Sequence, residues 1–434
     1  MAVPLRTGFE QPSFIVYEKD RGSYYAKEGR TGDIAYGGPN NVGGVSGSSF
    51  SAVLQAAINA LTAGRTHPEA VAVKGSVTLD VKISVPGYTV LDLTNAKLTA
   101  KVSLNDNMIE ATGYFFKIVG GILDGNKANN ASGSCIRLLP GAQRWFIQGV
   151  RIINAKQHGI YAEGVEVNQV GVGDIEGNDV EDAGANGIFL GPWTADHLIR
   201  GNNIGGCSGI GILLSASYDN LIEHNLVWNN TGNGIDVYAS HNNTVVGNRA
   251  DYNGAHGINV EESNRNTVEG NTVHDNGSVS AGVYSGIFVK NANYNTVVGN
   301  KSWNTVTVFQ GYGITESGTS DYNNIRDNEV SGNVTAGVVR VGGHTTVRGN
   351  LGYVNENQGI AVMAAGGAIT VNHHMDEIPV VIHVTAQGDL GDVYVPGGDK
   401  ITVTGFTIVA DTPVAGVSVF WEAYAKSMGM WLFW

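Results

Sequence analysis

The sequence predicts an all-β fold, a right-handed parallel β-helix in which short strands and turns coil into a rod. Three observations predict it: a composition rich in Gly and poor in charge, an Asn that returns about every 23 residues, and a Gly-Ile pair that returns in step with it. Gly accounts for 61 of 434 residues and charged residues for 15%, which is typical of a turn-rich solenoid. A period of this length indicates a repeat architecture, in which each coil packs only against its neighbours.

The recurring Asn marks the same turn in every coil. Its side chain tolerates left-handed backbone and can hydrogen-bond to the same Asn one coil further on. We therefore expect a structural ladder of stacked amides rather than a catalytic set. The members of this ladder are Asn178, Asn202, Asn225, Asn248, Asn271, Asn300, Asn328 and Asn350. A second ladder is expected five residues later, at Asn230, Asn253, Asn276, Asn333 and Asn355.

Two apolar marks complete each coil. One is the Gly-Ile pair, and the other is an Ile or Val three positions before the Asn, so each coil reads as three short strands separated by turns. Because side chains alternate along a strand, the residues two after the Asn, such as Val227 and Val273, should point into the rod. The Gly-Ile pairs begin at Gly159, Gly187, Gly211, Gly234, Gly257, Gly286, Gly313 and Gly359.

The repeat divides the chain into four parts. Residues 1–48 are expected to form an N-terminal extension, and residues 49–371 the β-helix, which opens with a capping helix over residues 49–63. A cap is expected because a bare stack would expose strand edges. Alternating strands without the Asn predict a small β-sandwich-like domain over residues 372–426, and residues 427–434 form an apolar tail.

Charge and hydropathy exclude several classes of partner. A net charge of −13 argues against nucleic acid, because phosphate binding needs a basic surface. No run approaches the roughly 18 apolar residues that span a bilayer, and no signal peptide is visible, so we expect no membrane partner. Cys135 and Cys207 lie in separate coils without a CxxC motif and are expected to be buried structural thiols.

The ladder, the Gly121-Ile122-Leu123-Asp124-Gly125-Asn126 segment and the Ala56-Ala57-Ile58-Asn59 helix together resemble the pectate-lyase-like superfamily of β-helix proteins. The resemblance covers roughly residues 50 to 370. It looks closest to the branch of phage tailspikes, bacterial polysaccharide lyases and mannuronan epimerases, and it implies a carbohydrate substrate and an extracellular or virion-associated location. The C-terminal segment resembles domains that end phage spikes, which implies a homotrimer. The Tyr-Gly-x-Asp-Pro-His motif of the epimerases and the paired aspartates of polygalacturonases are absent.

A line of candidate site residues follows three positions after each ladder Asn. In a parallel stack equivalent positions lie about 4.8 Å apart, so this column becomes a line on the outside of the rod. It reads Glu181, Gly205, Trp228, Asp251, His274, Trp303, Ser331 and Tyr353. We expect Trp228 and Trp303 to stack on sugar rings and Asp251 to orient His274. The alternative is that outward residues on a rod are polar in any case.

The same column can perform β-elimination on a uronic acid. His274 would remove the proton α to the carboxylate, and Arg249 or Lys301 would neutralise that carboxylate. Tyr252 or His256 would protonate the leaving oxygen. Two coils are lengthened by insertions around residues 278–284 and 305–311, which should wall a groove beside His274.

A second outward line follows the Gly-Ile mark and is dominated by carboxylates. Its residues are Asp236, Asn259, Phe288 and Thr315, followed two positions further on by Tyr238, Glu261 and Lys290. We expect Tyr238, Glu261 and Lys290 to contact the substrate. In a glycoside hydrolase, Asp236 with Glu261 or Glu262 would be the catalytic pair, and Ca²⁺ can bind among such acids, as in lyases that this fold resembles.

The sequence thus favours a polysaccharide lyase that acts on alginate-like or pectate-like polymers, with an acidic polysaccharide as partner. Two alternatives stay open, a tailspike-type glycoside hydrolase and a non-catalytic carbohydrate-binding spike.

Overall fold

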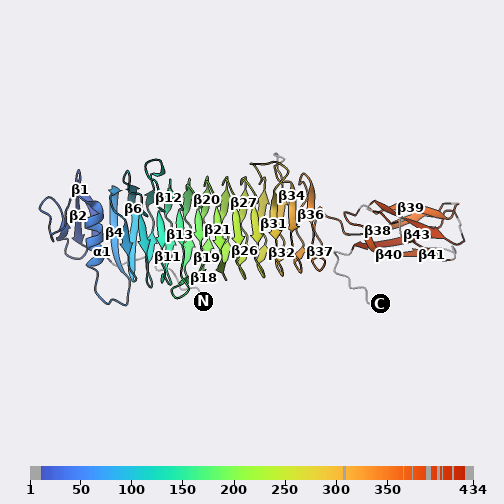
Figure 1. Ribbon diagram of the computed structural model, residues 1–434, viewed down its shortest axis with the longest axis horizontal. Coiled ribbons are helices and arrows are strands. Elements are labelled where there is room, and N and C mark those ends of the chain that lie inside the picture. Colours follow the sequence, from blue (N-terminus) through green and yellow to red (C-terminus); the bar gives the residue numbers. More distant parts are fainter. Residues whose placement is uncertain are drawn as a thin grey trace.

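The computed structural model describes residues 11–305, 309–364, 366–373, 375–387, 392–397, 401–402, 404–412 and 415–425. They form a long rod of coiled strands that is followed by small antiparallel sheets (Figure 1). The predicted parallel β-helix is confirmed. The apolar tail expected at residues 427–434 lies outside the described residues.

Three strands make one coil, as expected. The strands before the Asn turn are β8 (Lys117–Val119), β11 (Phe146–Gln148), β15 (Asp174–Glu176), β19 (Leu198–Arg200), β23 (Leu221–Glu223), β26 (Thr244–Val246), β29 (Thr267–Glu269), β32 (Thr296–Val298), β35 (Asn324–Arg326) and β37 (Thr346–Arg348). Those after it are β9 (Ile122–Asp124), β12 (Arg151–Ile153), β16 (Asp179–Glu181), β20 (Asn203–Gly205), β24 (Leu226–Trp228), β27 (Arg249–Asp251), β30 (Thr272–His274) and β33 (Lys301–Trp303). Both sets belong to one sheet, which we call the Asn-turn sheet.

The third strand of each coil belongs to a second sheet, which we call the Gly-Ile sheet. It is formed by β5 (Ile83–Val85), β7 (Ile109–Ala111), β10 (Ile136–Leu138), β13 (Ile160–Ala162), β17 (Ile188–Leu190), β21 (Ile212–Ser215), β25 (Ile235–Tyr238), β28 (Ile258–Glu261), β31 (Ser285–Lys290), β34 (Tyr312–Ser317) and β36 (Ala336–Val339). Shorter elements between the sheets are the 3-10 turn η1 (Lys127–Asn129) and strands β14 (Val170–Gly171), β18 (Thr194–Ala195) and β22 (Ser217–Tyr218).

Apolar side chains fill the inside of the rod. Val227, Ala250 and Val273 come from successive coils and are fully buried, as the alternation predicts. Each buried Val or Ile contributes about 1.5–3 kcal/mol relative to exposure. A slip by one residue would turn a whole set of such side chains to solvent, so the apolar pattern fixes the register. Cys135 and Cys207 lie in the same core, where burial raises the pKa of both thiols.

The predicted Asn ladder is confirmed from Asn178 to Asn350 without a break. In a typical step the Asn248 Nδ2 donates to Asn271 Oδ1 at 3.1 Å and to the Ile222 carbonyl at 2.9 Å. The Asn248 Oδ1 accepts from the backbone and side-chain amides of Asn225, both at 2.9 Å. Each amide thereby satisfies buried backbone groups of its own turn and of the neighbouring coil, which holds the coils in register.

The second ladder is confirmed at Asn230, Asn253 and Asn276 and then takes a different residue. In the lengthened coil its place is taken by Gln310, which accepts from Asn276 Nδ2 at 3.4 Å and donates to Asn333 Oδ1 at 2.7 Å. The longer side chain spans the turn that the insertion displaces.

A third ladder stands five residues before the first and was not expected from the sequence. Its members are Asn220, Asn243, Asn266, Asn295 and Asn323. The signal was present as the spacing Asn-x₄-Asn in each of these coils, in segments such as NTVVGN and NTVEGN.

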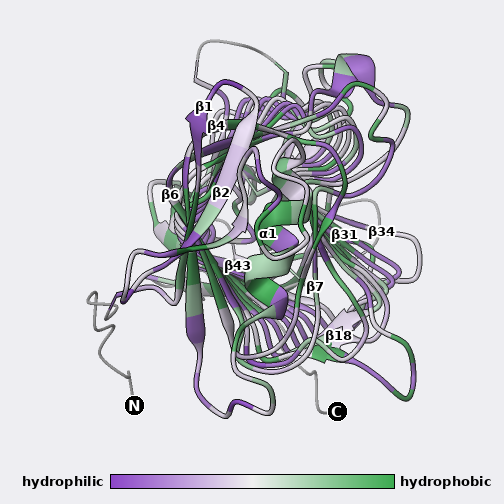
Figure 2. Ribbon diagram, turned by 90° about the vertical axis from the view of Figure 1, so that its left-hand side faces the viewer, coloured by the Kyte–Doolittle hydropathy of each residue, from purple (hydrophilic) through white to green (hydrophobic). Residues whose placement is uncertain are grey.

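The N-terminal end of the rod is closed by a helix, as predicted. Helix α1 (Phe50–Asn59) begins at Ser49, whose Oγ accepts from the Ala52 amide at 3.1 Å. The helix lies across the end of the rod (Figure 2), and its buried residues belong to the same core as the first coils. The segment before it is more than an extension, since β1 (Phe14–Asp20) pairs in parallel with β4 (Glu69–Leu79) and antiparallel with β2 (Ser23–Glu28). Strand β3 (Ile34–Gly37) pairs with β2, and β6 (Thr89–Ala100) continues from β4 into the coils.

The antiparallel part of the chain begins earlier than the expected boundary at residue 372. Its two sheets are formed by β38 (Glu356–Val362), β40 (Pro379–Ala386) and β43 (Ser418–Ala425), and by β39 (Ala368–Asn372), β41 (Val393–Tyr394) and β42 (Gly405–Ala410). Gly359 and Ile360, placed in the Gly-Ile column by sequence, instead pair antiparallel with Trp421 and Phe420. Ile360 is exposed, whereas the Ile of a true coil is buried. The column ends at Val338, which pairs with Ile314.

Asn248→Ala should lower the free energy of unfolding by about 3 kcal/mol, because it leaves buried amide groups of two neighbouring coils without partners. Denaturant unfolding followed by circular dichroism measures the loss. Asn95→Ala, at an exposed position of β6, is the matched control and should change stability by less than about 0.5 kcal/mol. Equal effects of the two substitutions would contradict the role given to the ladder.

Candidate active site

The candidate column lies on consecutive coils, in the register that the sequence predicts. The chain of strand pairs runs Glu181, Gly205, Trp228, Asp251, His274 and Trp303. Arg249, Thr272 and Lys301 form the parallel column two residues earlier. The sequence therefore placed these residues correctly relative to one another.

The burial of the central pair differs from expectation. Asp251 and His274 were expected on the open surface, yet they are 4% and 6% exposed. Neighbouring rings cover them: the indole of Trp303 lies 5.2 Å from the His274 ring, and the edge of Tyr252 meets it at 5.8 Å. An outward side chain is thus buried because large aromatic side chains lie on both sides of it.

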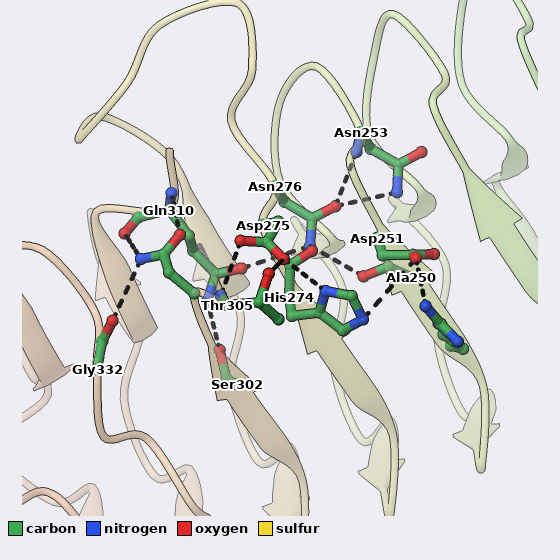
Figure 3. Close-up of polar contacts among 12 residues, drawn as sticks. Ala250, Asp251, Asn253, His274, Asp275, Asn276, Ser302, Thr305, Gln310 and Gly332 are labelled. Carbon is green, nitrogen blue, oxygen red and sulfur yellow. Dashed lines mark hydrogen bonds and ion pairs between the residues drawn. The ribbon is translucent and has the colours of Figure 1, made fainter. Parts of the chain in front are cut away.

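The carboxylate that orients His274 is Asp275, which the sequence analysis missed. Asp275 Oδ2 lies 2.8 Å from His274 Nδ1, whereas Asp251 Oδ2 lies 3.8 Å from Nε2, beyond hydrogen-bond reach (Figure 3). Asp275, and not Asp251, is therefore the residue that orients the His274 ring. Asp275 is fully buried and accepts from the Thr305 backbone amide at 2.9 Å and the Thr305 hydroxyl at 2.6 Å.

The backbone explains how adjacent residues face each other. Asp275 has a φ of 55°, in the left-handed region, and the equivalent Asn229 and Tyr252 have φ values of 51° and 55°. This turn brings the Asp275 carboxylate back toward the strand end. A column of residues directly after the candidate line, read as Asn229, Tyr252 and Asp275, was the signal available in the sequence.

The Asp275 contact sets the tautomer of His274. Since a carboxylate accepts, the hydrogen is assigned to Nδ1, and Nε2 then carries the free lone pair on the Asp251 side. This arrangement is that of an oriented base. Asp251 Oδ1 is buried and has no hydrogen-bond partner within the described part of the chain.

Two cations stand at the rim of the pair, and each faces an acid. The Arg249 guanidinium lies 2.9 Å from Asp251 Oδ2, and its side chain is 54% exposed. Lys301 Nζ lies 3.7 Å from Glu329 Oε2 and its side chain is 61% exposed. Both exposed charges are within reach of a solvent-borne ligand.

A groove of about 320 Å³ opens on the side of Trp303 away from His274. It is lined by Lys301, Trp303, Asn304, Glu329, Ser331 and Gly332. The described residues of the two insertions meet in the turns that follow β30 and β33, where the Gly282 amide donates to the Phe309 carbonyl at 2.7 Å. Residues 306–308 of the second insertion lie outside the described residues.

The second expected line also lies in register, on the outer face of the Gly-Ile sheet. Asp236 is held by Asn233 Nδ2 at 2.7 Å and Asn259 Nδ2 at 2.9 Å, and burial raises its pKa to about 6. Glu261 pairs with Lys290 at 2.7 Å. The charge of Glu262 raises the pKa of the Tyr238 hydroxyl.

His256 is placed as a structural residue rather than as a proton donor. Its Nδ1 accepts from the Ser285 amide at 3.0 Å, and its ring stacks on Phe288 with centroids 4.2 Å apart. Burial lowers its pKa to about 4, so the ring is neutral at pH 7 and is no imidazolium acid. Tyr252, half-exposed beside His274, is the better-placed donor of the two.

The described residues contain neither a metal-binding cluster nor a membrane-spanning helix. No group of three or more His, Cys, Asp or Glu side chains there is arranged to hold a metal ion. Among the same residues, no helix has the length and apolar character needed to cross a membrane.

The stacked coils and their two long parallel sheets place the chain among the solenoid repeat proteins. Residues 134–285 and 262–374 match the family model for the right handed beta helix region, and together they cover more than half of the chain. The chain therefore belongs to the right-handed β-helix family. No curated protein matches the sequence at a significant level.

Solved structures with the same fold include an epimerase module and two tailspikes. The A-module of mannuronan C-5 epimerase AlgE4 from Azotobacter vinelandii is 17% identical, with a TM-score of 0.56 over 70% of this chain and 96% of that one. The Dettilon tailspike protein is 13% identical, with a TM-score of 0.56 over 87% and 91%. The enzymatically active domain of bacteriophage CBA120 tailspike protein 2 is 12% identical, with a TM-score of 0.55 over 95% and 74%. At these identities the likeness is one of fold.

The rod should lose stability as the pH falls from 6.5 to 4. Burial lowers the pKa of His158, His197 and His256 to about 4, so the unfolded chain binds these three protons over this range while the folded chain does not. Asp236, with its pKa raised to about 6, opposes them with one proton. Unfolding therefore takes up roughly two protons near pH 5, and the free energy of unfolding changes there by about 2.7 kcal/mol per pH unit.

Denaturant unfolding at a series of pH values measures this slope. His256→Gln, which keeps an acceptor for the Ser285 amide, should reduce the slope by about one proton. Stability that stays level or rises toward pH 4 would contradict the assignment.

Proposed function

We propose that this chain cleaves a uronic-acid-containing polysaccharide by β-elimination, with His274 as the base and Asp275 as its positioning residue. The observation that carries the proposal is the 2.8 Å Asp275–His274 contact, which leaves the lone pair of Nε2 to accept a proton on the side where Asp251 Oδ2 lies 3.8 Å away. The substrate class is an acidic polymer of the alginate or pectate kind.

We assign one group to each chemical step. His274 Nε2 removes the proton at C5, α to the carboxylate, while Arg249 or Lys301 neutralises the enolate-like charge. The electron pair forms the C4–C5 double bond and the C4–O bond to the leaving sugar breaks. Tyr252, whose ring touches the edge of His274, donates the proton to the leaving oxygen. The base returns to neutrality by losing its proton to water, and the Tyr252 phenolate recovers its proton from water.

The arrangement along the rod supports a polymeric substrate. Trp303 stands between His274 and the groove, and Trp228 lies two coils from His274 in the opposite direction along the rod. A coil spacing of about 4.8 Å is close to the length of one sugar residue, so a chain parallel to the rod meets one coil per sugar. The mannuronan C-5 epimerase among the structural neighbours supports a uronic acid substrate, since C5 epimerisation also begins with loss of the C5 proton.

A second function, glycoside hydrolysis, is favoured by one observation. Asp236 has a pKa raised to about 6, which suits a general acid near neutral pH, and Glu261 or Glu262 would be its partner. In this reading Tyr238, Glu261 and Lys290 contact the substrate. A non-catalytic carbohydrate-binding spike is the third reading. In all three we place the chain outside the cell or on a virion, as a homotrimer, which the tailspike neighbours support.

Incubation with alginate, polygalacturonate and neutral polysaccharides separates these functions. β-Elimination yields unsaturated products that absorb in the ultraviolet together with new reducing ends, whereas hydrolysis yields reducing ends alone. Deuterium incorporation at C5 without chain shortening would indicate epimerisation. Binding without any of these products would leave the spike reading in place and reject the enzyme.

His274→Ala should reduce turnover by about a thousandfold, because the variant lacks the base while the fold is retained. His67→Ala, at an exposed position near the N-terminal end, is the matched control and should keep full activity. Initial rates from ultraviolet absorbance measure both. Wild-type rates in the His274 variant would reject the site.

Asp275→Asn should reduce kcat by about 10²- to 10⁴-fold and leave KM nearly unchanged. The amide can donate to Nδ1, which moves the His274 hydrogen to Nε2 and removes the accepting lone pair; the range is that known for tautomer inversion in catalytic His–Asp pairs. A purely structural Asp275 predicts a fall in thermal stability that parallels the fall in activity, which unfolding of the same variant would reveal.

A further inference from the structure

A different edge of the rod presents a second column of outward residues. They directly precede the third Asn ladder or its equivalents, in the turn that leads from the Gly-Ile sheet to the next strand. The column reads Asp196, Asp219, Asn242, Arg265, Tyr294, Tyr322 and His344, and the side chains are exposed. The turn that carries the column, around residues 239–243 in one coil, differs from the turn around residues 252–257 that borders His274.

The same backbone conformation recurs along most of this column. The turn holds the column in the left-handed region, with φ values from 56° to 60° between Asp196 and Tyr322. Asp and Asn tolerate this conformation, but Arg265, Tyr294 and Tyr322 are bulky residues that rarely adopt it. Bulky side chains occupy the equivalent turn of earlier coils as well, with φ values of 54° at Phe115 and 55° at Arg144, so the left-handed conformation is a property of this turn in each coil.

The bulky side chains form a continuous stack. The Arg265 guanidinium lies over the Tyr294 ring at 5.8 Å, Tyr294 stacks on Tyr322 at 5.1 Å, and Tyr322 stacks on His344 at 4.4 Å. The cation–π contact modestly favours this position of the Arg265 guanidinium. Arg265 therefore forms the C-terminal end of the surface that precedes it along the rod.

On that side lies an open groove of about 490 Å³, a size typical of small-ligand sites. Its lining includes Asp196, Asp219, Asn242 and Arg265 from the column, together with the rings of Tyr218 and His241. The two rings stack with centroids 5.7 Å apart. The groove thus combines an aromatic surface with polar groups on consecutive coils.

The chemistry of the lining selects the ligand. Carboxylate and amide oxygens about one coil apart are acceptors for sugar hydroxyls, and the coil spacing of about 4.8 Å matches successive sugars. Aromatic rings pack against the apolar faces of sugars. Two carboxylates against one guanidinium disfavour an anionic sugar, because like charges repel at this distance. A neutral sugar chain fits these constraints.

We propose that the groove between Asp196 and Arg265 is a second glycan-binding site, which takes a neutral, hydroxyl-rich oligosaccharide and is separate from the His274 line. The site holds a glycan without reacting on it. It does not depend on the reaction proposed for His274, since none of its residues belongs to that line.

Titration calorimetry of the full chain with neutral oligosaccharides of glucose, mannose and galactose, and with oligomers of mannuronate and galacturonate, tests the proposal. The variant Asp219→Gly with Asn242→Gly removes two polar groups without backbone strain, because Gly adopts the left-handed conformation freely. We expect at least one neutral oligosaccharide to bind, and to bind the double variant at least about tenfold more weakly.

His224→Gly is the matched control, because His224 is an exposed left-handed turn residue on another edge of the rod. It should bind as the wild type does, and so should His274→Ala, which separates this site from the proposed active site. The proposal is overturned if none of the neutral sugars binds, if the double variant binds them unchanged, or if only the acidic oligomers lose affinity in that variant.

Discussion

The vertical register of the coils is the constraint on which every other feature depends. Three Asn ladders hold it through buried amides, and the apolar residues inside the rod resist any slip. Only in this register does Asp251 lie beside His274 and His274 beside Trp303. The same constraint turns a conformational preference into a surface, because a left-handed turn repeated in each coil becomes a column of exposed side chains.

The fold could be predicted from the sequence because the residues that determine it recur at regular intervals. The first ladder, the Gly-Ile strands and the capping helix each repeat a local rule, and each lies where that rule puts it. Gly359-Ile360 obeyed the same rule and still departed from the rod. The pair lies after Asn350, the last Asn of the ladder. The strand that contains it pairs with β43 and not with a strand of the preceding coil.

The candidate site was predicted in position but not in detail. The spacing of the repeats predicts which strand residues pair, and it therefore identified the residues beside His274 on the neighbouring coils. The contact with Asp275 depends on a left-handed turn that brings adjacent residues face to face, and strand alternation assigns such residues to opposite sides. The burial of His274 depends on the rings of Trp303 and Tyr252, whose orientation no spacing determines. The sequence indicated His256 as a proton donor. The sequence alone does not reveal that its ring is packed against Phe288.

Gln310 shows how a coil can be lengthened while the hydrogen bonds between coils are kept. Its side chain is one methylene longer than Asn, and it joins Asn276 to Asn333 across a coil that carries extra residues. A single conservative exchange therefore lets a loop grow on one edge while the amides above and below remain bonded. The length of a loop is thereby independent of the hydrogen bonds that hold the coils together, so a groove wall can be extended while the rod itself stays unchanged.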